Sequence, residues 1–101
     1  DIKLAGKTGY DHNIDFLIPP SKNKPERLIK TINQPKKDYV MGTIFSFNDI
    51  SAIREQESKN YVIYNDLDNA VSQDSISALS KYNITPIAWS QKVNIKTEFA
   101  Q

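Results

Sequence analysis

The chain has 101 residues, of which 39% are apolar and 10% aromatic, values typical of one globular domain with a packed core and too rich in aromatics for a disordered chain. Thirteen basic residues against twelve acidic ones give a formal net charge of +1, so total charge favours neither nucleic acid nor a membrane surface as partner. The chain has no cysteine, which excludes disulfides and thiolate metal sites and fits a cytoplasmic protein. No apolar run is long enough to span a membrane.

The first predicted element is a β-hairpin. Residues 2–5 alternate apolar and polar side chains, and the segment 14–18 is strand-like. Between them, Gly6 and Gly9 provide turn chemistry. Pro19 and Pro20 end the second strand, because proline cannot donate to a β-ladder.

The next segment predicts two helices. Pro25 suits a first helical turn, and the apolar stripe that follows predicts a helix over residues 25–33, ending before Pro35. The composition of residues 38–50 favours a strand, whereas the spacing of their apolar side chains favours a helix. We expect a helix over 35–48, with Gly42 costing about 1 kcal/mol relative to alanine.

The second half predicts a strand-helix-strand unit. Residues 61–64 read as a buried strand, residues 72–83 as a helix with Ser72 as N-cap, and residues 84–89 as an edge strand containing Pro86. Residues 91–101 are expected to form a loose tail, either as a terminal helix or as a frayed end. The predicted order is ββααβαβ, an α/β (α+β) fold with helices packed on a small mixed sheet and a parallel right-handed crossover.

Candidate catalytic residues lie at predicted strand ends. His12 and Asp15 begin the second strand, and Asp66 follows the third. Together with Asp49, the two aspartates are candidate ligands for Mg²⁺ or Mn²⁺, as in a metal-dependent nuclease with His12 as base and Lys7 stabilising charge. The Glu-x-Lys or Gln-x-Lys pair of restriction-type nucleases is missing. The competing interpretation is structural, with Asp66 closing a turn and His12 hydrogen-bonded. Asp15 is harder to explain in this way and would need a partner such as Lys7 or Arg27.

A second set of candidates would bind an anionic partner. Six cations fall within sixteen residues, on and around the helix predicted at 25–33: Lys22, Lys24, Arg27, Lys30, Lys36 and Lys37. Clustered cations bind phosphates, although a solvated helix face explains the cluster equally well. Trp89 is a candidate for stacking or partner binding, or alternatively for core or rim packing.

Several short motifs in order resemble a known family. They are GKTGYDHNIDFLIP from Gly6, KPERLIKTIN from Lys24, the Phe-x-Phe-x-Asp stretch ending at Asp49, YVIYND from Tyr61, and ISALSKYNITPIAWS ending at Ser90. This series resembles the domain-of-unknown-function family eighteen-twenty-nine. The resemblance implies a bacterial or prophage source and a C-terminal domain that follows a second domain. It supplies no established activity.

We therefore expect a binding module for nucleic acid or a protein partner. The segment with clustered lysines and the lack of a complete catalytic set motivate this expectation. A divergent metal-dependent nuclease is one alternative, and that alternative alone would need a cofactor. A dimerisation domain with Phe47 and Trp89 as apolar anchors is another.

Overall fold

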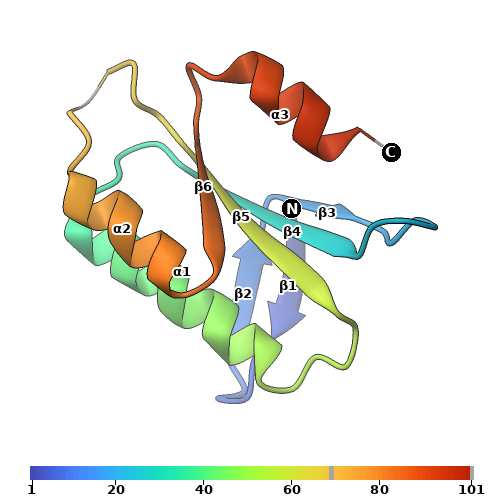
Figure 1. The fold of residues 1–101 in the computed structure, drawn as a ribbon. Coiled ribbons are helices and arrows are strands. Elements are labelled where there is room, and N and C mark those ends of the chain that lie inside the picture. Colours follow the sequence, from blue (N-terminus) through green and yellow to red (C-terminus); the bar gives the residue numbers. More distant parts are fainter. Residues whose placement is uncertain (69, 101) are drawn as a thin grey trace.

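The computed structural model describes residues 1–68 and 70–100, and for Lys92 and Asn94 the backbone alone. The end of the predicted tail, Gln101, lies outside the described residues. The elements, in chain order, are β1 (Ile2–Ala5), β2 (Asp11–Ile14), β3 (Phe16–Ile18), β4 (Glu26–Ile32), α1 (Lys37–Ser51), β5 (Ser58–Tyr64), α2 (Gln73–Lys81), β6 (Ile84–Ala88) and α3 (Lys92–Phe99) (Figure 1). The predicted α+β class, with helices packed on a small mixed sheet, is confirmed.

The N-terminal hairpin is confirmed, but its second strand divides at Asp15. β1 and β2 pair antiparallel, with Ile2 opposite Ile14. Beyond Asp15, β3 leaves the hairpin and pairs antiparallel with β4, so the segment predicted as one strand serves two sheets. Asp15 is the residue at which the chain crosses from the first sheet to the second.

The main sheet has four strands in the order β3-β4-β5-β6. β4, β5 and β6 run parallel, and the two connections between them are α1 and α2. α1 and α2 lie against one face of the sheet, and α3 lies on the opposite side (Figure 1). The predicted strand-helix-strand unit is thus present as β5-α2-β6, with Pro86 on the edge strand.

The predicted helix over residues 25–33 is wrong, because this segment is the central strand β4. Leu28 packs into the core beneath α1 and α2, whereas its neighbour Ile29 packs into the core beneath α3. A strand buried on both faces has apolar side chains at adjacent positions, and over a few residues this pattern resembles one face of a helix.

The remaining elements follow the predictions closely. α1 covers the segment of mixed signals and begins two residues after the expected start. Ser72 caps α2, because its hydroxyl accepts hydrogen bonds from the N–H groups of Asp74 and Ser75. Most of the expected tail is the helix α3. In the described parts of the chain, none of the helices has the length and apolar character needed to cross a membrane.

Two hydrophobic cores sandwich the sheet. The larger core joins the face bearing Leu28 and Val62 to α1 and α2, and it includes Phe47, which is 1% exposed. The smaller core joins Ile29 and Tyr61 to α3. Phe47 is therefore a core residue, and the prediction that it anchors a dimer is wrong.

Candidate functional site

The carboxyl ends of β4, β5 and β6 carry polar residues that bond across neighbouring loops. The Asp66 carboxylate accepts hydrogen bonds from the Ser90 backbone N–H at 3.0 Å and the Ser90 hydroxyl at 2.6 Å. The Asn65 amide donates to the Asn33 side-chain oxygen at 2.9 Å. The Ser90 hydroxyl bond holds the pKa of Asp66 below its usual range. These bonds fix the edge of the sheet where parallel α/β folds bind ligands.

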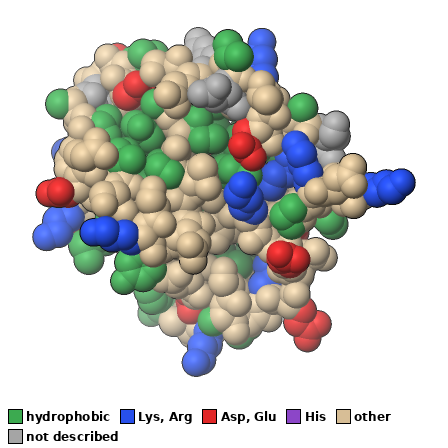
Figure 2. All heavy atoms as spheres, viewed as in Figure 1, with side chains coloured by type: hydrophobic (Ala, Val, Ile, Leu, Met, Phe, Trp, Pro, Cys, Tyr) green, Lys and Arg blue, Asp and Glu red, His purple; other side chains and the backbone are tan. Residues whose placement is uncertain are grey.

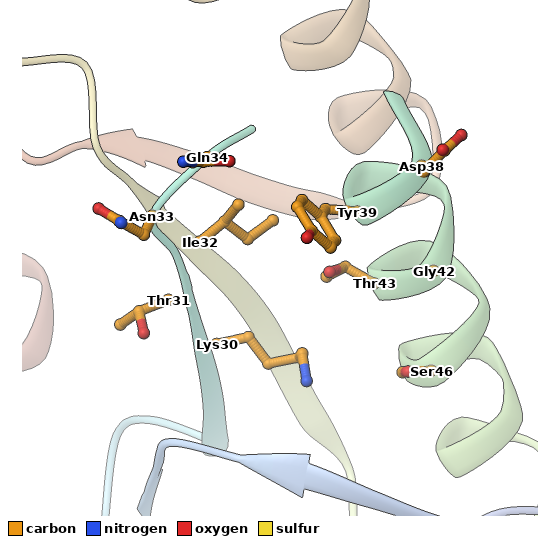
Figure 3. A pocket seen from close by; sticks show the side chains of 10 residues that line it. All are labelled: Lys30, Thr31, Ile32, Asn33, Gln34, Asp38, Tyr39, Gly42, Thr43 and Ser46. Atoms are coloured by element: carbon orange, nitrogen blue, oxygen red, sulfur yellow. The ribbon is translucent and has the colours of Figure 1, made fainter. Parts of the chain in front are cut away.

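A hollow of about 680 Å³ lies at this edge, between the end of β4 and α1 (Figure 3). Its lining consists of Lys30, Thr31, Ile32, Asn33, Gln34, Asp38, Tyr39, Gly42, Thr43 and Ser46. Figure 3 shows Lys30, Tyr39 and Thr43 pointing into the space between strand and helix, whereas Asp38 points away from the strand. The hollow therefore offers hydroxyl, amide and ammonium groups to a polar ligand.

Gly42 keeps one wall of this hollow open. A Cβ atom built at Gly42 would meet no heavy atom of the described residues within 4 Å, and Gly42 does not have a positive φ. Packing therefore does not require glycine here, although glycine inside a helix costs about 1 kcal/mol relative to alanine. The lack of a side chain leaves room beside α1 instead.

Lys30 holds its ammonium group beside the N-terminal hairpin. Its Nζ donates to the backbone oxygen of Asn13 at 2.6 Å. Burial lowers the pKa of Lys30, and the nearby Asp15 carboxylate partly offsets that effect. Lys30 thus places a positive charge at the hollow, in a position fixed by its hydrogen bond to Asn13.

Two further hollows adjoin the first. One, of about 330 Å³, shares Thr31, Ile32 and Asn33 with it and reaches Trp89. The other, of about 410 Å³, shares Gln34 and is lined by Lys36 and Lys37. We call the three hollows together the strand-end groove. Two aromatic rings stand on its rim, Tyr39 at 58% and Trp89 at 43% exposure.

The α1 side of the groove is positively charged. The first and third hollows are lined by three lysines, Lys30, Lys36 and Lys37, and one carboxylate, Asp38. Within the described part of the chain, no side chain caps the N-terminus of α1, so its first N–H groups open beside Lys36 and Lys37. This side of the groove suits an anion.

Asp15 lies beside the groove and bonds to β4. Its carboxylate accepts hydrogen bonds from the Thr31 backbone N–H at 2.7 Å and from the Thr31 hydroxyl at 3.2 Å. Its own N–H donates to the Ile29 carbonyl at 3.0 Å. Asp15 therefore supplies hydrogen-bond partners to β4 at the point where the chain passes from one sheet to the other. The sequence alone did not indicate its contact with Thr31.

His12 and Asp49, both predicted site residues, lie together. His12 Nε2 is 2.8 Å from Asp49 Oδ2, and the same carboxylate accepts hydrogen bonds from the Thr8 hydroxyl at 2.6 Å and the Thr8 N–H at 3.0 Å. These bonds, from the Thr8 hydroxyl first and His12 second, hold the pKa of Asp49 below its usual range. The Phe45 ring meets the His12 ring edge-on at 6.0 Å. The cluster fastens the hairpin turn to α1.

The predicted catalytic and metal-binding residues bond to different partners. His12 bonds to Asp49, Asp15 to Thr31, and Asp66 to Ser90. Within residues 1–68 and 70–100, no three His, Asp or Glu side chains gather where they could hold a metal ion. The nuclease hypothesis thus has no three-ligand site for Mg²⁺ or Mn²⁺ among these residues.

The predicted basic residues do not share one surface. Because residues 26–32 form an extended strand, Lys24 lies at the opposite end of β4 from Lys36 and Lys37. Arg27 is 1% exposed, so it is a buried side chain rather than part of an open basic face. Lys7 lies exposed in the hairpin turn. Figure 2 likewise shows Lys and Arg side chains interspersed with other types over the surface.

Sequence reasoning missed several groove residues, among them Gln34, Tyr39 and Gly42. Only Gly42 gave a signal, as a glycine inside a helical pattern with no evident turn. Gln34 lies in the loop after β4 and Tyr39 lies on α1, and sequence alone did not place these two segments side by side.

The family model of DUF1829, a domain of unknown function, matches residues 6–92. The match covers most of the chain, which therefore belongs to this family. No curated protein and no solved structure matches the chain.

Proposed function

We propose that this member of the DUF1829 family is a binding module for single-stranded nucleic acid, and that the strand-end groove holds the strand. The observation that carries the proposal is the groove itself, with polar walls, two exposed aromatic rings, and a lining that holds three lysines and two aspartates, Asp38 and Asp68.

Each part of the groove matches one need of such a ligand. Exposed bases stack on aromatic rings, a role for Tyr39 and Trp89. Gln34 offers an amide donor and acceptor to base edges, as is usual when RNA or DNA is recognised in single-stranded form. Phosphates would meet Lys36 and Lys37 at the open N-terminus of α1.

The groove also favours a single strand over a duplex. The first two hollows meet at residues 31–33 and the third joins the first at Gln34, so a ligand that fills all three must bend around the end of β4. A flexible strand with unstacked bases can follow such a path, whereas a duplex is stiff over this length.

The test is a fluorescence-anisotropy titration with single-stranded DNA and RNA oligonucleotides at low and moderate salt. The double variant Lys36→Gln/Lys37→Gln should bind about tenfold more weakly at low salt, and the slope of log K against log salt should shrink by about 1.4 because two phosphate contacts are lost. The control Lys3→Gln/Lys22→Gln removes two exposed lysines away from the groove and should bind as the wild type does.

Absence of salt-dependent binding to any single strand would remove the proposal. Equal losses of affinity in the test and control variants would show that binding depends on total positive charge and not on the lysines of the groove. The expectations of a bacterial or prophage source, a cytoplasmic location and an upstream domain rest on composition and the family resemblance, and they accompany this proposal.

A further inference from the structure

A second set of cations lies on the sheet face beneath α3, on the side away from the large core. Arg27, although 1% exposed, uses only one of its guanidinium nitrogens: Nη1 donates to the Glu98 carbonyl at 3.1 Å. Its Nε and Nη2 are buried without a hydrogen-bond partner among the described residues. These two nitrogens form the edge that binds a carboxylate side-on, and a buried cation without partners is costly.

The last turn of α3 meets this face through acidic and carbonyl oxygens. The Tyr61 hydroxyl donates to the Glu98 carboxylate at 2.7 Å, and Lys59 Nζ lies 3.9 Å from the same carboxylate. Lys24 Nζ donates to the Ala100 carbonyl at 3.0 Å. The cationic face thus receives a helix C-terminus, the negative end of the helix dipole.

Apolar contacts complete the fit. Ile95 and Phe99, four residues apart on α3, pack against the core formed by Ile29, Tyr61, Ile63 and Ile87, and the Phe99 ring meets Tyr61 edge-on at 4.7 Å. The other side of α3 is open to solvent, with Val93 77% exposed. The face therefore recognises an amphipathic helix by two apolar side chains and an acidic end.

α3 is an imperfect occupant of this face. It presents its only nearby carboxylate, Glu98, to Tyr61 rather than to the free edge of Arg27. The family match covers residues 6–92 and so includes the face, and it ends at the first residue of α3. A helix that places a carboxylate against Nε and Nη2 would satisfy the charge of Arg27.

From these contacts we infer that the α3-covered face, formed by Lys24, Arg27, Lys59 and Tyr61 with the apolar residues between them, is a docking site for an acidic amphipathic helix of a partner protein. α3 occupies the site in the free protein and competes with that partner. This site is separate from the strand-end groove and does not depend on the proposed nucleic-acid function.

The test uses the full chain and a labelled peptide with the sequence of residues 91–100 as probe. Ile95→Asp removes an apolar anchor of α3 and leaves the face intact. Fluorescence anisotropy should show the peptide binding to Ile95→Asp at least tenfold more tightly than to the wild type, whose face is covered. Adding Arg27→Gln to Ile95→Asp should weaken binding at least tenfold, as should Glu98→Gln in the peptide. Phe99→Ala in the chain is a milder opening variant should Ile95→Asp lose its fold.

Equal peptide binding by the wild type and both opened variants would overturn the inference. A wild-type dimer in light scattering that is lost in Ile95→Asp would also overturn it, because α3 of a second copy would then be the occupant. So would binding of a single-stranded oligonucleotide, instead of the peptide, that depends on Arg27. Because the peptide assay leaves Lys36 and Lys37 untouched, its failure is distinct from a failure of the groove.

Discussion

The Asp49 carboxylate fills the space that a side chain on Gly6 would need. A Cβ atom at Gly6 would lie 1.9 Å from Asp49 Oδ2, too close for any real contact. The two residues are 43 positions apart in the sequence, yet their approach sets how the hairpin meets α1. Glycine at position 6 is thus a packing requirement, imposed by a buried acid on a helix.

Gly6→Ala should destabilise the protein by about 1–3 kcal/mol, because the added methyl group forces Asp49 or the turn to move. Chemical denaturation followed by circular dichroism measures the loss. Gly42→Ala is the matched control, since nothing among the described residues stands near a Cβ there. A Gly6→Ala variant as stable as the wild type would contradict the close approach.

Asp49 should make stability depend on acid pH. Its folded-state pKa is lowered, chiefly by the Thr8 hydroxyl and His12, whereas the unfolded value is about 3.9. Its contribution is therefore complete above that value and is lost as the pH falls through the folded-state pKa. Thermal melts between pH 2 and 6 should show a shallower acid dependence for Asp49→Asn, with exposed Asp11→Asn as the control. Parallel acid curves for wild type and Asp49→Asn would refute this role.

Glycine at position 42 should lower the stability of α1 and keep the strand-end groove open. Gly42→Ala should raise the free energy of unfolding by about 0.5–1 kcal/mol, because alanine is the better helix former. Gly42→Leu would extend a side chain into the hollow and weaken oligonucleotide binding at least tenfold while the fold stays intact. Unchanged binding by a folded Gly42→Leu would show that the hollow is not used.

Tyr39 should carry part of the binding free energy through stacking. Tyr39→Ala should weaken single-strand binding by about 1–3 kcal/mol and leave the salt dependence unchanged, because a ring and not a charge is lost. Tyr10→Ala, which removes a 72% exposed ring from the hairpin turn, serves as the control. A changed salt slope without a loss of affinity at constant salt would contradict a stacking role.

Local patterns predicted most of the fold. Alternation in residues 2–5, the Ser72 cap and the short run at 61–64 each identified the right element, because the local signal and the packed environment agree there. The prediction for residues 26–32 failed because α1 and α2 bury one face of β4 and α3 buries the other. The pairing with β3 and β5 that places β4 inside the sheet is not visible locally. The division of the predicted strand 14–18 at Asp15 was missed for a related reason, because it depends on the pairing of β3 with β4.

The candidate site was less predictable than the fold. His12 and Asp49 were both selected as site residues, but their contact spans 37 positions and uses Thr8, which no pattern indicated. The sequence predicted Arg27 to be a surface cation, but it lies on β4 beneath α3 and is buried. The groove forms where β4 and α1 lie side by side. The positions of Tyr39 and Gly42 in its lining therefore follow from tertiary structure and could not be predicted from local sequence.

The most direct measurement is a map of amide chemical shifts in the folded protein as a single-stranded oligonucleotide is added. We expect the largest changes at Asn33, Gln34, Gly42 and the Trp89 indole, along the strand-end groove, with residues in β1 and α3 unaffected. Changes confined to the hairpin turn or to α3, or none at saturating ligand, would contradict the central claim that the strand-end groove binds single-stranded nucleic acid.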